Sequence, residues 1–289
     1  MILALLLLLA QQRVGTQPCA CGPADLSRVN SEAVTIHERR SLDAASALYT
    51  KVLKASPPAD STPDQMRLAR RFAPRIYTTR TEPFPLKDFA IILHPTEPLI
   101  TYHFFWEDDI DFPDDNDPCD HELMWVRYDP SSGKVTGYAT YFHGRILVAP
   151  KEAVDDANRN GGRPRVLTQW GKHGSMPPGW EKLEIIADAG DVEREFYPNR
   201  LISMEQYQRG TYQKLSTLGR QAQDSPLSRG WPVKFSGSWQ DFVNFSRLVD
   251  PLKWLDRSGY IKVSCWNNAV IDRHFLLYNF RPKTEWWCP

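Results

Sequence analysis

A proline-interrupted acidic run is the feature that most constrains how this chain can fold. It extends from Trp106 to Glu122 and contains nine carboxylates. Pro113 and Pro118 prevent a regular helix or a central strand here, because proline lacks a backbone N–H and restricts φ. Apolar segments of the kind that form strands flank the run on both sides. We therefore expect an acidic loop that is displayed from the end of a sheet.

The like charges of this loop repel one another unless they face open water, bind basic groups or hold a divalent cation. A solvated acidic loop and a cation site are the two main alternatives. Oxygen ligands would favour Ca²⁺ or Mg²⁺, whereas two or more imidazoles would favour Zn²⁺ or Mn²⁺. The candidate metal ligands are Asp115, Asp120, His121, Glu122, His143 and His173, and the candidate ligand contacts are Asp111, Asp114, Lys172 and Trp180.

Three of these candidates are histidines that stand beside glycine or acidic residues, each at the end of a predicted strand. They are His121, His143 and His173. In a β-sandwich, strand ends from distant parts of the chain gather at one rim, so the three side chains could converge there. Ordinary hydrogen bonding under turns is the alternative for each of them. His103 lies within a strand, where a core or cross-strand position is expected.

Beyond residue 72 the sequence consists of short β-type runs that are separated by prolines. The predicted strands are 91–93, 99–106, 123–128, 134–142, 165–170, 260–266 and 274–280. Long helices do not alternate with these strands, which favours an antiparallel β-sandwich over a parallel α/β sheet. Asp129 to Gly133 predicts a hairpin turn. The expected fold is therefore mainly β, with residues 73–289 forming an antiparallel sandwich.

The segment before the sandwich carries a different pattern. Residues 1–10 are almost wholly apolar but too few to cross a bilayer, so we expect a signal peptide over 1–22 and a secreted or periplasmic protein. Helical spacing from Ser41 to Ala55 predicts a helix. Thr62, Pro63 and Asp64 predict the start of another, which ends near Phe72. Residues 23–72 are thus expected to form a helical N-terminal arm.

Five cysteines add a possible covalent constraint: Cys19, Cys21, Cys119, Cys265 and Cys288. In an exported protein, a disulfide from Cys119 to Cys265 or to Cys288 would fix the acidic loop to the C-terminal part, although the sequence leaves the pairing open. The balanced charge of the chain gives no indication of nucleic-acid binding. The oligomeric state is likewise open.

Known motifs exclude several classes of site. His121 begins a sequence like that of a zinc metalloprotease helix, but Trp125 occupies the position of the second histidine. An EF-hand counted from Asp111 fails because Pro113 and Asn116 stand at its third and sixth positions. The sequence also lacks a Gly-x-Ser-x-Gly elbow, a phosphate-binding loop and a dinucleotide fingerprint.

Several short motifs follow one another in a recognisable order between residues 69 and 180. They are Arg71-Phe-Ala-Pro-Arg-Ile-Tyr77, Glu82-Pro-Phe-Pro85, the Asp120 to Trp125 segment, His143-Gly144, Arg163-Pro-Arg-Val-Leu167 and Gly171-Lys-His-Gly-Ser175. In this order they resemble the necrosis-inducing protein superfamily and its vacuolar-sorting-type relatives. The resemblance implies a β-sandwich with a divalent cation in an acidic cavity at its rim, through which toxic members bind a sphingolipid head group.

The chain departs from that family at two of the implied metal ligands. Met124 and Val126 stand where the family has aspartate and glutamate. Neighbouring acids would have to replace them, and the candidates are Asp114, Asp115, Asp120 and Glu122. Otherwise this branch has lost the ion.

Three functions remain compatible with the sequence. The leading hypothesis is an exported β-sandwich protein with a divalent-cation-dependent site for a polar small molecule, lipid head group or glycan. The second is a metal-dependent hydrolase, in which Glu122 or Asp120 is the general base and His143 or His173 stabilises developing charge. The third is a structural extracellular domain whose acidic loop only maintains solubility. The sequence does not decide whether the protein is an enzyme.

Overall fold

Most strands of the chain belong to two sheets. The computed structural model describes residues 28–29, 31–33, 35–36, 41–55, 59–107, 109–111, 115–116, 120–186, 200–217, 237–258 and 261–263. The larger sheet has seven strands in the order β1 (Ala59–Asp60), β15 (Ile261–Val263), β3 (Leu86–Leu93), β4 (Leu99–Trp106), β7 (His121–Asp129), β8 (Lys134–Phe142) and β9 (Arg145–Val148). The smaller has four, in the order β11 (Ser175–Met176), β10 (Arg165–Thr168), β2 (Arg75–Thr78) and β14 (Arg247–Val249).

Strand pairing in these sheets is mostly antiparallel, as predicted. The exceptions among the described pairs are β15 with β3 and β10 with β2, which are parallel. Two short pairs complete the strands: β5 (Ile110–Asp111) with β6 (Asp115–Asn116), and β12 (Glu184–Ile186) with β13 (Leu201–Ser203). The expectation of a mainly β, sandwich-like fold is confirmed.

The main core lies between the two sheets. Alternate residues of β4, which are Ile100, Tyr102, Phe104 and Trp106, point toward it and are buried. Ile76 of β2 and Val166 of β10 approach from the smaller sheet, and all six belong to one apolar cluster. Phe89 of β3 stacks on both Tyr102 and Phe104. The period of two along each strand therefore directs one set of side chains into the sandwich interior.

The opposite face of β4 is buried as well. Thr101, His103 and Phe105 are all fully buried, and so are Leu123 and Trp125 on the adjacent strand β7. Every residue of β4 is therefore removed from solvent. The core or cross-strand position expected for His103 is confirmed.

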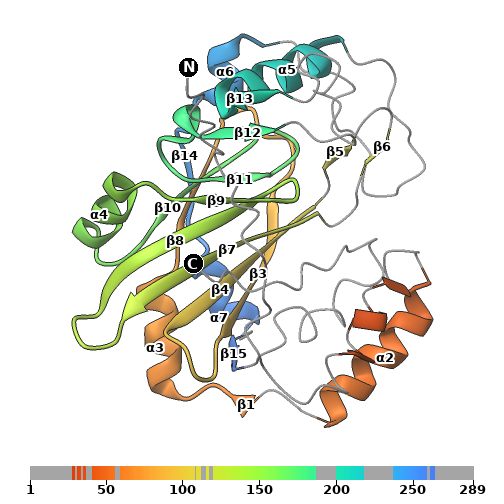
Figure 1. Ribbon diagram of the computed structural model, residues 1–289, viewed down its shortest axis with the longest axis vertical. Helices are drawn as coiled ribbons and strands as arrows, with labels where there is room; N and C mark the ends of the chain where they lie inside the picture. The colour runs from red at the N-terminus through yellow and green to blue at the C-terminus, as the bar shows by residue number, and fades with distance from the viewer. Residues whose placement is uncertain are drawn as a thin grey trace, which may run out of the picture.

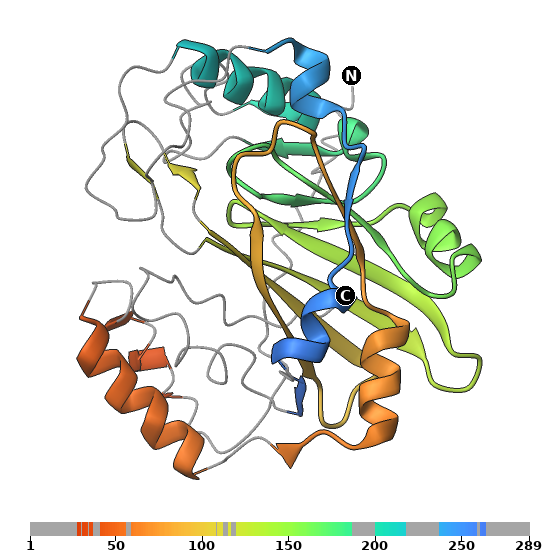
Figure 2. The same ribbon diagram turned by 180° about the vertical axis from the view of Figure 1, so that it is seen from behind.

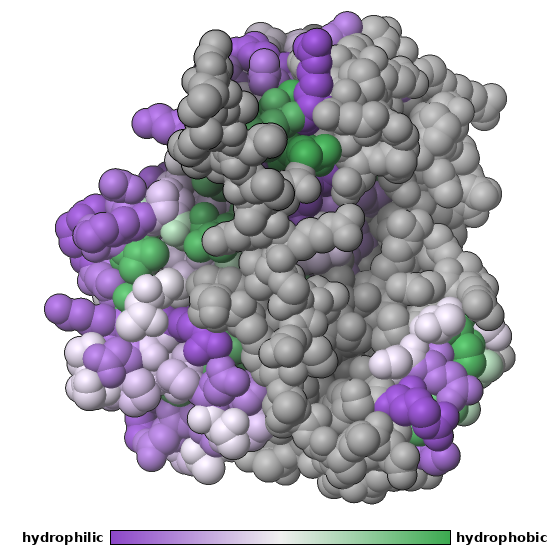
Figure 3. All heavy atoms as spheres, in the orientation of Figure 1, coloured by the Kyte–Doolittle hydropathy of each residue, from purple (hydrophilic) through white to green (hydrophobic). Residues whose placement is uncertain are grey.

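The helices stand around the sheets. They are α2 (Leu42–Ala55), α3 (Pro63–Arg71), α4 (Lys151–Arg159), the 3₁₀ turn η1 (Trp180–Lys182), α5 (Met204–Thr217), α6 (Trp239–Val243) and α7 (Leu252–Ser258). Figures 1 and 2 show α5 and α6 together at one end of the molecule, with α2 at the opposite end. Figure 3 shows mainly hydrophilic side chains where α4 and the β7–β8 hairpin lie in Figure 1.

Helix α3 begins where the sequence indicates. Thr62 is its N-cap: the hydroxyl accepts from the Gln65 N–H, and the Gln65 side chain accepts from the Thr62 N–H. This reciprocal capping box satisfies two backbone donors, and Pro63 fits the first helical position. Ala69 of α3 is buried in the core between the sheets. This helix therefore packs with the sandwich rather than apart from it.

The predicted strands agree with the structure to different degrees. The strands at 99–106 and 134–142 have the predicted bounds, whereas β3 begins five residues earlier than predicted, at Leu86 rather than Ile91. Residues 210–217, for which the polar sequence left a loop and a short helix open, belong to α5. The signal peptide, the five cysteines and the strand at 274–280 lie outside the described residues.

Candidate functional site

A strained turn at the end of β10 positions the central residue of the site. Gln169 and His173 close it through two backbone hydrogen bonds: the His173 N–H donates to the Gln169 carbonyl, and the Gln169 N–H donates to the Gly174 carbonyl, both at 3.0 Å. His173 has φ of 52° and Gly171 has φ of 64°. Positive φ is unfavourable for a residue with a side chain, so the surrounding contacts must hold His173 in place.

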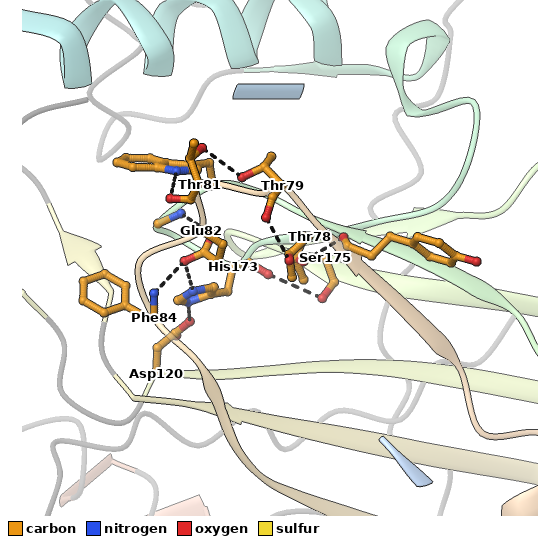
Figure 4. A network of polar contacts seen from close by, with 12 residues as sticks. Thr78, Thr79, Thr81, Glu82, Phe84, Asp120, His173 and Ser175 are labelled. Atoms are coloured by element: carbon orange, nitrogen blue, oxygen red, sulfur yellow. Dashed lines mark hydrogen bonds and ion pairs between the residues drawn. The ribbon is translucent and has the colours of Figure 1, made fainter. Parts of the chain in front are cut away.

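Two carboxylates hold the imidazole of His173. Its Nδ1 lies 2.9 Å from Oδ2 of Asp120, and its Nε2 lies 3.1 Å from Oε1 of Glu82. Figure 4 shows the two acids pointing toward the ring from opposite sides. The side chains of His173 and Glu82 are 0% and 2% exposed, and that of Asp120 is 9% exposed. We call these three residues the His173 bridge.

The imidazole in the His173 bridge is held in its charged form. Burial by itself would lower the pKa of His173, but the Glu82 and Asp120 carboxylates outweigh it and raise the pKa to about 10. The ring also stacks on Trp106, with centroids 4.3 Å apart and planes at 4°. An aromatic face and two carboxylates both favour the imidazolium form. With both nitrogens donating, His173 offers no lone pair to a metal ion in this arrangement.

Glu82 is held in place by the backbone as well as by the histidine. Its Oε1 accepts from the Phe84 N–H at 3.1 Å, and its Oε2 accepts from the Gly171 N–H at 2.9 Å. Glu82 was not among the site residues predicted from the sequence. The sequence feature that could have indicated Glu82 is the Glu82-Pro-Phe-Pro85 motif, which lies directly before β3. This motif is the third part of the chain that contributes a residue to the site.

The same turn anchors the beginning of the acidic run. The Ile110 N–H donates to the Gly171 carbonyl at 2.7 Å, and Nζ of Lys172 donates to the Ile110 carbonyl at 2.8 Å. Lys172 is only 8% exposed. Its ammonium group therefore binds the backbone of the acidic run, where the sequence suggested a contact with an external ligand.

Strand alternation separates two predicted neighbours at the start of β7. Glu122 pairs with Phe104, whose side chain faces the interior of the sandwich, whereas His121 pairs with Phe105 on the opposite face. There, Nε2 of His121 lies 2.7 Å from Nδ1 of His103, and the His121 ring stacks on Phe105 at 4.9 Å. His121 therefore contacts His103 instead of joining the His173 bridge.

His143 lies beside the turn but makes a separate contact. Its Nε2 is 2.5 Å from Oε1 of Gln169, and Nε2 of Gln169 donates to Oε1 of Gln208 at 2.8 Å. Gln208 in turn donates to the sulfur of Met176 at 3.0 Å. This chain of polar groups connects the β8–β9 turn to α5. It brings His143 to the same rim through Gln169, the residue that closes the His173 turn.

The remaining candidates fall into two groups. Trp180 is 2% exposed and packs edge-on against Phe245 at 6.2 Å, so the exposed ligand contact expected for it is wrong. The physical reason is burial of its large indole in a second apolar cluster. The buried members of this cluster are Phe142, Leu147, Leu167, Met176, Trp180, Ile185, Ile202, Met204 and Tyr207. Asp111 and Asp115 are paired in the β5–β6 ladder. Their side chains, and all of Asp114, lie outside the described residues.

The described part of the chain contains only some of the predicted cation ligands. There, no three or more His, Cys, Asp or Glu side chains are placed so that they could hold one metal ion. Asp120 and Glu82 offer oxygen donors of the kind that Ca²⁺ and Mg²⁺ prefer, but both already bind His173. A complete site would require acids from 108–119, and the predicted metal site stays a prediction.

Comparisons with known proteins give partial structural likenesses. No family model matches the chain, and no curated protein matches it. A necrosis- and ethylene-inducing protein 2 from the causal agent of cocoa's witches' broom disease is 14% identical, with a TM-score of 0.32, over 55% of this chain and 82% of that one. A structure described as a toxin fold for microbial attack and plant defense is 12% identical, with a TM-score of 0.31, over 56% and 84%.

The sandwich architecture itself rests on the strand pairing of this chain. The resemblance to vacuolar-sorting relatives stays a prediction. No helix among the described residues has the length and apolar character needed to cross a membrane.

Proposed function

We propose that this chain is an exported recognition protein that binds a polar lipid head group or glycan at the rim formed by the His173 bridge and the acidic run. The single observation that supports the proposal best is the bridge itself. It unites Glu82, Asp120 and His173 from three distant segments, in a nearly dry environment. Asp120 of the bridge lies near the end of the acidic run, so we propose that the polar site lies where the run meets the bridge.

Stability alone gives a poor reason for this arrangement. Removing three charged groups from water costs free energy that their mutual attraction only partly returns, and apolar side chains of similar volume usually serve a core as well. Buried charged groups with perturbed proton affinities are instead common at functional sites, particularly where loops leave a rigid sheet. Asp120 is the most exposed member of the bridge and directly precedes β7. It is therefore the member that we assign to ligand contact.

The proposal includes a divalent cation, Ca²⁺ or Mg²⁺, bound by Asp120 together with acids of the run 108–119. Such an ion would neutralise part of the acidic run and bridge protein oxygens to ligand oxygens. Zn²⁺ or Mn²⁺ is the alternative ion. The crowding of carboxylates in this run supports the cation.

Calorimetric titration of the purified chain with CaCl₂, MgCl₂, MnCl₂ and ZnCl₂ tests the cation. We expect stoichiometric binding of one of these cations by the wild type. The affinity should fall by at least about tenfold in Asp120→Asn, because a lost charged ligand costs more than about 1.4 kcal/mol. The affinity should not change in Asp155→Asn. Asp155 is a matched control because it pairs with Lys151 on the surface of α4. Absence of binding would exclude the cation, and equal weakening in both variants would exclude Asp120 as its ligand.

Flotation with vesicles tests the ligand separately. Vesicles of phosphatidylcholine with and without a glycosylated inositol-phosphate sphingolipid would be compared in the presence of the preferred cation and in the presence of chelator. Retention only by the glycosylated vesicles, and only with the cation, is expected. Cation binding without any retention would leave the ion in place and reject the lipid head group as ligand, which a soluble-glycan array would then replace.

A further inference from the structure

A tripeptide outside the His173 bridge has the sequence of an N-glycosylation acceptor. Asn244, Phe245 and Ser246 form the Asn-x-Ser pattern, and no other Asn-x-Ser or Asn-x-Thr occurs in the sequence. Oligosaccharyl transfer in the secretory pathway requires this pattern, with any residue except proline in the middle. A matching tripeptide can accept a glycan only if the folded chain leaves room for it.

The fold leaves the asparagine accessible and does not use its side chain. Asn244 is the C-cap of α6, with φ of −81° and ψ of 81°, and it is exposed. Its backbone N–H donates to the Gln240 carbonyl at 2.8 Å. Within the described residues, its side-chain amide forms no hydrogen bond. Because φ is negative, the backbone does not require asparagine at this position either.

The two neighbours of Asn244 in the tripeptide point in different directions. Phe245 is partly buried and packs edge-on against Trp180, with ring centroids 6.2 Å apart. Ser246 is exposed, like Asn244. Phe245 therefore anchors the tripeptide to the second apolar cluster, while the acceptor asparagine and the serine face solvent.

The tripeptide leads directly into an open sheet edge. Strand β14 begins at Arg247 and, in the described part of the chain, pairs only with β2. Figure 2 shows this blue strand running down from α6. Its middle residue, Leu248, is 50% exposed. An exposed edge strand with an apolar side chain is a template for pairing with another chain, and proteins usually cover or charge such edges.

We propose that Asn244 is N-glycosylated during export and that its glycan covers the β14 edge. This modification requires secretion through a glycosylating pathway but not the ligand proposed above. The donor is an oligosaccharide linked to a polyprenyl diphosphate. A bond forms between Nδ2 of Asn244 and the sugar C1, the bond from C1 to the diphosphate oxygen breaks, Nδ2 loses one proton, and the polyprenyl diphosphate leaves.

The modification is tested by expressing the full chain in a eukaryotic secretory host and measuring intact mass before and after peptide N-glycosidase. We expect glycan mass on the wild type and its loss in Asn244→Gln and in Ser246→Ala. Ser246→Thr preserves the acceptor pattern and should keep the glycan. Secreted wild type without glycan mass, or glycan retained in Asn244→Gln, would overturn the assignment.

Aggregation kinetics test separately whether the glycan shields the β14 edge. Light scattering of the glycosylated and the enzymatically deglycosylated wild type should show a several-fold faster rise in scattering for the deglycosylated protein. Asn244→Gln should behave like the deglycosylated protein, and Asn244→Gln combined with Leu248→Lys should return to the slow rate, because a charge on the edge replaces the cover. Equal rates with and without glycan would reject the shielding role while leaving the modification intact.

Discussion

Two buried histidine contacts lie on opposite faces of the strand pair β4 and β7. Each of them satisfies a buried imidazole in a different way. On the interior face, His173 is held between the carboxylates of Glu82 and Asp120. On the other face, His121 shares one hydrogen bond with His103 inside an aromatic stack. Asp120 and His121 are adjacent in sequence, yet they serve different contacts.

The difference shows what each arrangement can do chemically. Opposite charges surround His173 and favour its imidazolium form, and the side chain of Asp120 beside it is 9% exposed. A hydrogen bond between two imidazoles requires one nitrogen to donate and the other to accept, so the His103–His121 pair cannot carry a proton on both facing nitrogens. The first contact suits a polar binding site, and the second suits a core.

The largest expected effect follows from removing one member of the ionic contact. Glu82→Gln leaves the buried imidazolium with one carboxylate, and breaking a buried ion pair in this way costs about 3–5 kcal/mol of unfolding free energy. Urea denaturation followed by tryptophan fluorescence measures the loss. A cost below about 1 kcal/mol, the range of an exposed pair, would show that the bridge carries no net charge interaction.

The next effect is a dependence of stability on pH, which arises from the protonation of His173. Its pKa is raised from 6.5 to about 10, so the folded state holds the proton more tightly than the unfolded state does. The resulting stability is fully present below the unfolded pKa of about 6.5 and is lost as the pH rises through about 10. Urea unfolding across this range should show the decline in the wild type and a weaker one in Glu82→Gln.

Nuclear magnetic resonance gives an independent measure of the same property. At neutral pH, ¹H–¹⁵N spectra of the imidazoles should show both nitrogens of His173 protonated, and only one proton between the facing nitrogens of His103 and His121. Neutral-imidazole signals from His173 would contradict its charged state.

The His103–His121 pair should respond less strongly and in a non-additive way. His121→Phe removes the partner of a buried His103 nitrogen, which costs about 1–3 kcal/mol, and His103→Phe should do the same. The double variant should lose less than the sum, because replacing both partners with apolar rings leaves no unmatched polar atom. A double-mutant cycle in urea measures the coupling, and strict additivity would mean that the 2.7 Å contact contributes nothing.

The smallest effect is expected at an exposed pair close to the site. Lys87 and Glu107 form an ion pair whose side chains are 53% and 29% exposed. Glu107→Gln should change the unfolding free energy by about 0–1 kcal/mol, and salt should reduce that change further. This variant is also the matched control for Glu82→Gln, since both replace a glutamate with its amide. A loss as large as that of Glu82→Gln would contradict the distinction between buried and exposed charges.

Local patterns in the sequence were sufficient for much of the fold. The apolar run at 99–106 predicted a strand whose bounds the structure reproduces. Thr62, Pro63 and Asp64 gave the start of α3. Both signals depend on a few neighbouring residues and on backbone geometry that every chain shares, so they can be read without knowing the fold.

The candidate site was predictable only in part. Asp120 and His173 were selected from their sequence context, and the structure brings them together. Glu82 was missed, because its role depends on a position 91 residues from His173 in sequence. Trp180 was misplaced, since nothing in its neighbourhood indicated that Phe245 would cover it.

By itself, the sequence determined that this chain forms a mainly β sandwich with an acidic run between two of its strands. Only the tertiary structure decided that Asp120 turns toward His173 while the adjacent His121 turns toward His103. The physical reason is that successive side chains of a strand point to opposite faces, so which face meets which partner depends on long-range strand pairing. That pairing directs two consecutive residues to different contacts: Asp120 to the ionic contact with His173, and His121 to the hydrogen bond with His103 in the core.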